Sequence, residues 1–231
     1  MQTTTTRPDT ADMRFGHQEG IRNTIVHGDC IDVMQRFPDR SIDLVLTDPP
    51  YICRYRARDG RTVANDDNDR WLGPAFSEVH RVLKEGGFAI SFYGWTAADK
   101  FISAWRSAGL RMVGHIVFRK HYASSQRFLR YTHEQAYLLA KGRPGLPETT
   151  IPDVIDWPRY TGNRLHPTEK PVEILHPLVE TFSRPGDLIL DPFCGSGSTL
   201  AAAHHSGRDY VGIELDRCHH RTACMRLGMA R

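Results

Sequence analysis

The amino-acid sequence predicts an α/β fold, in which a mostly parallel twisted sheet carries helices on both faces. Short apolar runs typical of buried strands alternate with amphipathic helical segments over most of the chain. Glycines follow several of the helical segments, where the chain must turn into the next element. At 231 residues the chain is long enough to bury a substantial core in one domain.

The predicted elements follow in order along the chain. Strands are expected near 23–27, 42–46, 88–93, 112–118, 134–140, 188–190 and 209–215, and helices near 32–37, 74–86, 96–109, 168–182, 198–205 and 216–227. Gly86-Gly87 is expected to end the second helix, Thr96 to cap the third and Gly109 to end it. No element is expected over 142–165, which is rich in proline and glycine.

Composition limits the classes of protein to which the chain can belong. The formal charge of +3 is mildly basic and permits a polyanionic partner. No apolar run is long enough to span a membrane, and five scattered cysteines favour a reduced, cytoplasmic setting. The spacing of Cys218, His219, His220 and Cys224 fits no standard zinc pattern, so no metal site is expected.

The segment Asp48-Pro49-Pro50-Tyr51 is the strongest candidate for a catalytic site. It follows the apolar run 42–46, and its prolines end the strand because they have no N–H to donate. The segment therefore lies at the carboxyl edge of the sheet. One carboxylate, rigid backbone carbonyls and one aromatic face suit a planar ring that bears an amine.

A second segment predicts a nucleoside pocket. Asp191-Pro192-Phe193-Cys194-Gly195-Ser196-Gly197 follows a strand and opens a helix, and its glycines allow close approach of the backbone to a ligand. Glu214 at the tip of the next strand can accept hydrogen bonds from two ribose hydroxyls. The third glycine of the diphosphate-binding fingerprint is missing, which favours an adenosine cofactor without a diphosphate.

Together these two segments resemble the S-adenosylmethionine-dependent amino-methyltransferases of DNA. The catalytic tetrapeptide precedes the cofactor loop, a permuted order similar to that of the beta group of N6-adenine and N4-cytosine enzymes. Gly28-Asp29 and the His-Pro-Thr-Glu-Lys-Pro segment 166–171 match two further motifs of that group. The resemblance runs from about 23 to 227. It implies a Rossmann-like class I methyltransferase fold with a circularly permuted motif order.

The resemblance also assigns roles to residues. The expected catalytic residues are Asp48, Pro49, Pro50 and Tyr51. The expected S-adenosylmethionine-binding residues are Asp29, Thr168, Lys170, Asp191, Phe193, Cys194, Gly195, Ser196, Gly197 and Glu214. Glu214 would hold the ribose, Asp29 would lie near the adenine, and Thr168 and Lys170 would flank the methionine end, with the lysine near its carboxylate.

The implied chemistry explains the catalytic set. An exocyclic aromatic amine is a poor nucleophile because its lone pair is delocalised into the ring. Two acceptors, the carboxylate of Asp48 and the carbonyl of Pro49, favour a tetrahedral nitrogen and stabilise positive charge as it attacks. A base inside a duplex must be flipped out to be reached, and Tyr51 would stack on it.

The double-stranded DNA substrate is expected to meet two basic stretches. One follows the catalytic strand and the other lies in mid-chain; their members are Arg54, Arg56, Arg58, Arg61, Arg119, Lys120, Arg127 and Arg130. Residues 1–20 are expected to form a flexible arm, and 21–231 the methyltransferase domain with short recognition loops near 52–71 and 119–165. Lacking the long insert of many relatives, the chain is expected to read a short or loosely defined target.

Several alternatives remain open at the level of sequence. Aspartate rather than serine before Pro-Pro favours adenine, with N4-cytosine methylation as the first alternative. RNA adenine methylation and a catalytically inactive DNA-binding regulator are the others. A homodimer is left open, and any restriction endonuclease would be a separate chain. Trp71 and Trp95 are assigned to the core, and Glu134 in His133-Glu134 receives no catalytic role.

Overall fold

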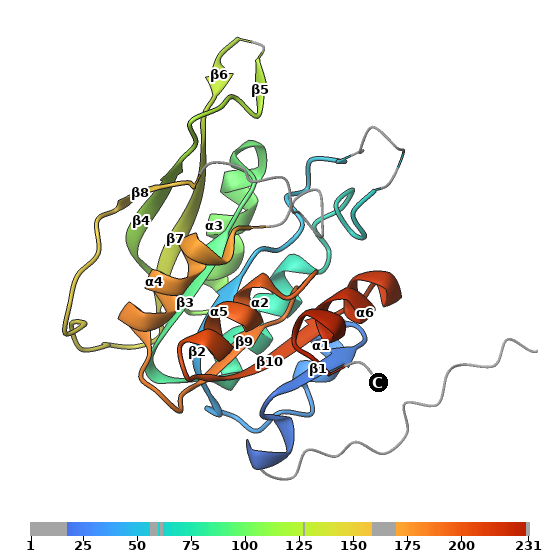
Figure 1. Ribbon diagram of the computed structural model, residues 1–231, viewed down its shortest axis with the longest axis vertical. Coiled ribbons are helices and arrows are strands. Elements are labelled where there is room, and N and C mark those ends of the chain that lie inside the picture. The colour runs from blue at the N-terminus through green and yellow to red at the C-terminus, as the bar shows by residue number, and fades with distance from the viewer. Residues whose placement is uncertain (1–17, 56–59, 61, 127, 159–169, 230–231) are drawn as a thin grey trace, which may run out of the picture.

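The computed structural model describes residues 18–55, 60, 62–126, 128–158 and 170–229. In this part of the chain an eight-stranded sheet has the order β1-β10-β9-β2-β3-β7-β4-β8, and β5 and β6 form a separate ribbon (Figure 1). The strands are β1 Thr24–His27, β2 Ile42–Thr47, β3 Leu83–Phe92, β4 Arg111–Arg119, β5 Ser125–Gln126, β6 Arg130–Tyr131, β7 His133–Ala140, β8 Val154–Asp156, β9 Leu188–Asp191 and β10 Asp209–Glu214.

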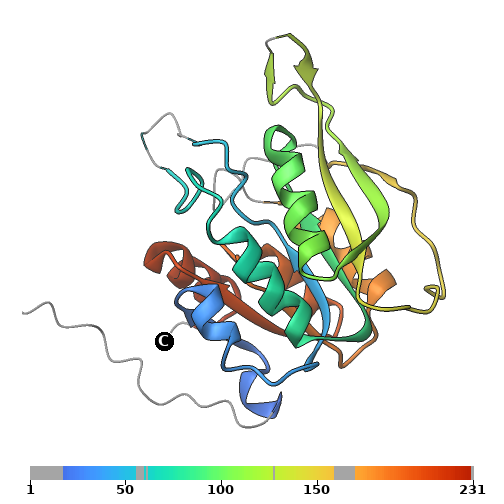
Figure 2. The same cartoon turned by 180° about the vertical axis from the view of Figure 1, so that it is seen from behind.

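Helices cover both faces of this sheet. They are α1 Cys30–Met34, α2 Leu72–Val82, α3 Ala98–Ser107, α4 Val172–Phe182, α5 Ser198–His205 and α6 Arg217–Arg226, with short 3-10 turns η1 Gln18–Ile21 and η2 Trp95–Ala97. Figure 1 shows α4, α5 and α6 in front of the sheet, and Figure 2, from behind, shows α1, α2 and α3. The predicted layers are confirmed.

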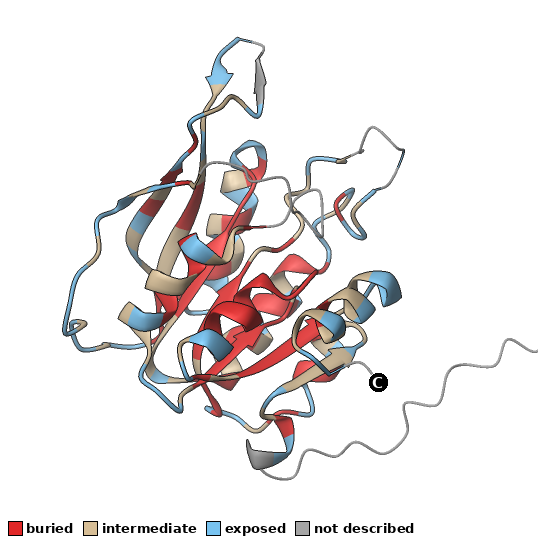
Figure 3. Cartoon of the chain, viewed as in Figure 1, coloured by how far each residue is buried: buried red, intermediate tan, exposed pale blue. Residues whose placement is uncertain are grey.

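Each face of the sheet has its own core. Phe76 and Trp105 belong to the cluster under α2 and α3, while Leu178 and Leu200 belong to the cluster under α4 and α5. Figure 3 shows that buried residues fill the sheet and the helix sides that face it. Burial on both faces explains why most residues of β2 and β9 are apolar. Among the described residues, no helix is long and apolar enough to cross a membrane.

The sheet is mostly parallel, as predicted. Among the described strands of this sheet, β7 alone runs antiparallel to its neighbours, β3 and β4. The central strand β2 pairs in parallel with β3 on one side and with β9 on the other. Because β2, β9 and β10 run in parallel, the residues that follow them meet at one edge of the sheet.

Gly86-Gly87 does not end a helix, contrary to the sequence prediction. Helix α2 ends at Val82, and β3 begins at once with Leu83 in an extended conformation. Both glycines lie inside β3, where the register against β2 is irregular. Gly86 has a positive φ of 75°, and a Cβ on Gly87 would lie 2.9 Å from Leu83 Cδ1. The glycines therefore form a bulge in the strand.

Three smaller predictions also differ from the structure. Ala97, rather than Thr96, caps α3, without a side-chain hydrogen bond. The short strand β8 lies within 142–165, where no element was expected, and pairs with β4. Trp95 is not in the core: it is 60% exposed and stacks on Tyr131 at a centroid distance of 5.8 Å. Trp71 is buried, as predicted.

Candidate active site

A cavity of ≈ 230 Å³ lies at the carboxyl edge of the sheet. Its lining joins the two segments that the sequence singled out, Asp48-Pro49-Pro50-Tyr51 after β2 and the loop 191–196 after β9. Asp29, Lys170 and Glu214 also line it. Two segments far apart in the chain thus form one pocket because β2 and β9 are neighbours in the sheet.

The carboxylate of Asp48 is held by two donors. The Tyr51 hydroxyl donates to Oδ1 at 2.8 Å, and the Lys170 ammonium donates to Oδ2 at 2.6 Å. The Lys170 nitrogen also lies 5.3 Å from the centroid of the Tyr51 ring and 4.9 Å from that of Phe92. Carboxylate, ammonium and aromatic ring therefore share one half of the cavity.

Glu134 at the start of β7 extends this ion pair into a network. Its Oε2 lies 3.0 Å from the Lys170 nitrogen, and its Oε1 accepts a hydrogen bond from the Lys120 ammonium. The Lys120 nitrogen lies 4.7 Å from the centroid of the Trp157 ring. The series Asp48–Lys170–Glu134–Lys120 alternates in sign, so each charge has an opposite neighbour.

The network shifts the pKa values of its members. Burial raises the pKa of Asp48, while Lys170 lowers it and Glu134 raises it. For Glu134, burial acts upward, but Lys170 and Lys120 outweigh it and bring the pKa to about 2. Burial lowers the pKa of Lys170, yet Asp48 and Glu134 raise it above its ordinary value. The ion pairs outweigh burial at Glu134 and Lys170 and favour their charged forms, whereas at Asp48 burial outweighs Lys170 and the pKa stays above its ordinary value.

The other half of the cavity begins at Asp191. This carboxyl group is buried and accepts hydrogen bonds from the Thr47 hydroxyl at 2.9 Å and the Phe193 amide at 3.1 Å. Burial raises the pKa of Asp191 to about 7. Because both of these hydrogen bonds come from the protein itself, Asp191 stabilises the conformation of the loop after β9.

Glu214 and the glycine loop are joined by hydrogen bonds. The Gly195 amide donates to Glu214 Oε2 at 2.8 Å, and the Asp216 amide donates to Oε1 at 2.7 Å. Gly195 and Gly197 have positive φ angles of 51° and 82°, which favour glycine. The tip of β10 and the loop after β9 are thereby held against each other.

The pocket has groups that fit an adenosine. Glu214 retains acceptor sites for hydroxyl groups, since a carboxylate has about four lone-pair sites. Asp29 caps α1 by accepting from the Ile31 amide at 2.8 Å and lies in the same lining. Phe193 packs edge-on against Trp71 and gives this side an apolar wall. Space around Gly195 is open, since a Cβ there would meet nothing within 4 Å.

The other residues predicted to bind the cofactor have the following positions in the structure. Cys194 and Ser196 are buried in the loop after β9 and line the cavity. Burial raises the pKa of the Cys194 thiol. Lys170, expected near the methionine carboxylate, has its ammonium between Asp48 and Glu134. Thr168 lies outside the described residues.

One predicted DNA contact needs correction. Lys120 is only 8% exposed, and its ammonium bonds Glu134 and Ser124. It is therefore part of the interior network and is not free to meet a phosphate. Sequence reasoning gave Glu134 no role. Its partners, Lys120 and Lys170, come from the segment after β4 and the segment before α4, and only the fold brings them next to Glu134 at the start of β7.

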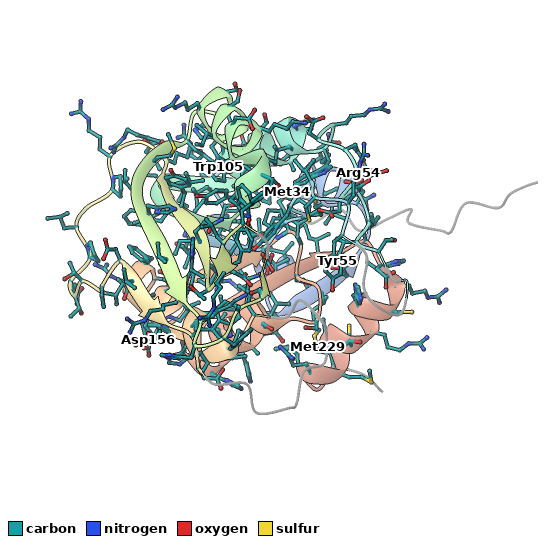
Figure 4. All side chains as sticks on the ribbon, turned by 90° about the horizontal axis from the view of Figure 1, so that it is seen from above. Met34, Arg54, Tyr55, Trp105, Asp156 and Met229 are labelled. Carbon is teal, nitrogen blue, oxygen red and sulfur yellow. The ribbon has the colours of Figure 1, made fainter. Side chains whose placement is uncertain are left out.

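The other predicted DNA contacts within the described residues, Arg54, Arg119 and Arg130, are exposed. Arg54 follows Asp48-Pro49-Pro50-Tyr51, Arg130 lies on β6, and Arg119 makes two hydrogen bonds to Asp156 at 2.7 and 3.0 Å. In Figure 4, Arg54 and Asp156 lie on opposite sides of the molecule as seen from above. The predicted contacts at Arg56, Arg58, Arg61 and Arg127 lie outside the described residues.

Comparisons with known proteins point to one family. A family model described as DNA methylase matches residues 42–225. The "Putative methylase YubD" of Escherichia coli (strain K12) is 53% identical over 202 residues, which cover 87% of this chain and 88% of the relative. The DNA adenine methyltransferase YhdJ of the same strain is 28% identical over 261 residues, covering 94% of this chain and 85% of the relative.

Solved structures share the fold. The Thermus thermophilus protein TTHA0409, in complex with S-adenosyl-L-methionine, is 25% identical with a TM-score of 0.66, covering 88% of this chain and 94% of that chain. The cytosine-N4-specific PvuII DNA methyltransferase has a TM-score of 0.74 at 16% identity, covering 89% of this chain and 86% of that chain. The latter likeness concerns the fold alone.

Proposed function

This chain belongs to the DNA methylase family, and we propose that it methylates the exocyclic N6 amine of an adenine flipped out of double-stranded DNA. The cofactor is S-adenosylmethionine. The observation that carries the proposal is the position of the Asp48 carboxylate beside the Tyr51 ring, in the cavity that Glu214 and Gly195 also line. An acceptor for an amine and a platform for a base thus face the pocket of the methyl donor.

The residues of the chain divide the work. Asp48 and the carbonyl of Pro49 accept the two amine hydrogens, which localises the nitrogen lone pair and stabilises the positive charge that develops there. Tyr51 supports the extruded base by stacking. Glu214 holds the ribose, Asp29 lies near the adenine of the cofactor, and S-adenosylmethionine supplies an electrophilic methyl group. Holding both reactants in line contributes much of the rate.

Adenine is the preferred target, and cytosine is the second candidate. The aspartate at position 48 and the name of the relative YhdJ support adenine. The same acceptors would also serve the N4 amine of cytosine, and the chain shares its fold with the cytosine-N4-specific PvuII enzyme. Both reactions need the same pocket chemistry, so the choice depends on how the ring of the base fits.

The loops near 52–71 and 119–165 are proposed to contact DNA from the two sides of the site. Arg54, Arg119 and Arg130 would face the phosphates. The methyltransferase domain is proposed to span 21–231 and to act in the cytoplasm. A second copy could supply further contacts as a homodimer. Any endonuclease that shares the target would be a separate chain.

The proposal is tested by incubating double-stranded DNA with the protein and methyl-labelled S-adenosylmethionine, followed by nucleoside analysis. N6-methyladenine is the expected product, and N4-methylcytosine in its place would favour the second candidate. Asp48→Ala should lower the transfer rate by about 100-fold or more, because an acceptor for the developing charge is lost. Cofactor binding should persist, because Asp48 lies in the other half of the cavity.

Asp99→Ala provides the matched control. Asp99 is an exposed carboxylate in the first turn of α3 and should leave the transfer rate unchanged. Transfer at the native rate by Asp48→Ala would contradict the mechanism. Binding of DNA by the native protein without any transfer would favour a regulator, and preferential transfer to RNA in a competition assay would favour an RNA enzyme.

A further inference from the structure

We propose that Lys170 and Glu134 are positioning residues for Asp48: Lys170 keeps the carboxylate charged and oriented toward the target amine, and Glu134 anchors Lys170. The inference rests on the proposed catalytic role of Asp48. Lys170 lies next to Asp48, with its Nζ 2.6 Å from Asp48 Oδ2, and Glu134 lies next to Lys170, with its Oε2 3.0 Å from the same nitrogen. The three residues come from three separate segments of the chain.

The two donors on Asp48 fix the plane of its carboxylate. Tyr51 donates to one oxygen and Lys170 to the other, so rotation of the group would break one hydrogen bond or both. Each carboxylate oxygen can accept about two hydrogen bonds. One acceptor site per oxygen therefore remains, and its direction is set before the amine arrives.

The surroundings of Lys170 restrict its ammonium to this place. Its side chain is 6% exposed and lies over the rings of Tyr51 and Phe92. A lysine bound to Asp48 alone would oppose the positive charge that develops on the amine. The second carboxylate, Glu134, compensates that charge from behind, and Lys120 in turn holds Glu134.

The charged neighbours of Asp48 act in opposite directions. Lys170 and the hydrogen bond from the Tyr51 hydroxyl favour its ionised form, whereas Glu134 and the buried Asp191 oppose it. Burial itself favours the neutral carboxyl group. A neutral carboxyl group has one fewer acceptor for the amine, so activity should fall on the acid side as Asp48 takes up a proton.

The test is the pH dependence of single-turnover methyl transfer in the full chain. Lys170→Met should move the acid limb of the profile to higher pH by about 1 unit or more, because the opposite charge beside Asp48 is removed. Glu134→Gln should move it to lower pH, because a like charge is removed. Lys170→Arg keeps the cation and should leave the limb near its native position.

The controls use an ion pair near the amino ends of β2 and β3, away from the cavity. Lys84 lies 2.6 Å from Asp43, and Lys84→Met and Asp43→Asn should leave the acid limb in place. Burial raises the pKa of Asp191 to about 7, so this group can also affect the pH profile of methyl transfer. Because every variant keeps Asp191, the variants are compared with one another by the displacement of the acid limb. Thermal melting verifies that each variant is folded.

The outcomes separate the inference from the function it rests on. Opposite displacements in Lys170→Met and Glu134→Gln support it. A lower rate with an unmoved limb, or displacement in the same direction, overturns it and leaves only a structural role. If Lys170→Met does not fold, Glu134→Gln and Lys170→Arg decide alone. Failure of the native protein to methylate DNA would instead refute the proposed function.

Discussion

At the scale of single residues, Glu214 shows how a binding group is fixed by the backbone. Both of its oxygens accept hydrogen bonds from main-chain amides, those of Gly195 and Asp216. If Glu214 holds the ribose as proposed, its carboxylate needs little reordering on binding, because its remaining lone pairs are directed in advance. A glutamine could not reproduce this, because its NH₂ group would face an amide N–H.

Glu214→Gln should weaken S-adenosylmethionine binding by roughly 10- to 100-fold, the range expected when hydrogen bonds to a charged group are lost. The expected measurement is the dissociation constant by calorimetry. Glu173→Gln, at an exposed position in the first turn of α4, should leave it unchanged. Equal affinity of Glu214→Gln and the native protein would show that this carboxylate does not hold the cofactor.

The cavity brings together most of the residues that the sequence singled out, but sequence reasoning did not find the network behind Asp48. Asp48, Tyr51 and Glu214 stand at strand ends within recognisable motifs, and neighbouring strands bring such ends together. Glu134 and Lys120 have no such signal. Their charges look like those of any polar strand end, and only the antiparallel pairing of β4 with β7 brings the two side chains into contact.

At the scale of elements, the segment just after β3 fits closely against Tyr51. A Cβ on Gly94 would lie 2.5 Å from the Tyr51 carbonyl oxygen and 2.8 Å from Tyr51 Cβ. Gly94 has a φ of −79°, so the backbone itself would accept another residue. A glycine is needed here because any side chain at position 94 would collide with Tyr51 in its present position.

Gly94→Ala should therefore displace Tyr51 and lower the rate of methyl transfer. Overpacking of this kind costs about 1–3 kcal/mol, and a comparable misplacement in the transition state would slow transfer by roughly 5- to 150-fold. The measurement is the transfer rate at saturating cofactor, with cofactor affinity expected to stay native. Gly73→Ala in α2, where a Cβ would meet nothing within 4 Å, is the control. An unaffected rate in Gly94→Ala would contradict this reasoning.

The periodicity of apolar residues predicted most helices and strands. It failed where pairing with a distant strand determines whether a segment becomes a strand. Gly86-Gly87 has the composition of a helix end, yet the strand absorbs both residues as a bulge. The three residues of β8 are too few to show a period, and they become a strand by pairing with β4. The helix α5, in contrast, was predicted with its observed bounds, because a glycine turn and an apolar run mark its start.

At the scale of the whole molecule, charge at the edge that holds the cavity should govern DNA binding. Arg54 is exposed directly after the catalytic segment. Arg184 is exposed near the start of β9, at the opposite edge of the parallel strands. We therefore expect a duplex whose base enters the cavity to contact Arg54 but not Arg184.

Arg54→Glu should lower DNA affinity and reduce the slope of log affinity against log salt by about 0.9 for a lost phosphate contact. Titrations of labelled duplex at several salt concentrations measure both quantities. Arg184→Glu makes the same change of charge and should have little effect on the slope. Equal weakening by both variants would indicate a response to net charge alone.

The pairing of β1 has a consequence for the order in which the molecule can form. β1 is an edge strand, and its neighbour β10 is the last strand of the sheet along the chain. The central strand β2 likewise gains its second neighbour, β9, only late in the sequence. On the ribosome, both strands emerge long before these partners exist. The cavity can therefore close only after β9 and β10 have emerged, and until then a nascent chain would carry Asp48-Pro49-Pro50-Tyr51 without the loop after β9 beside it.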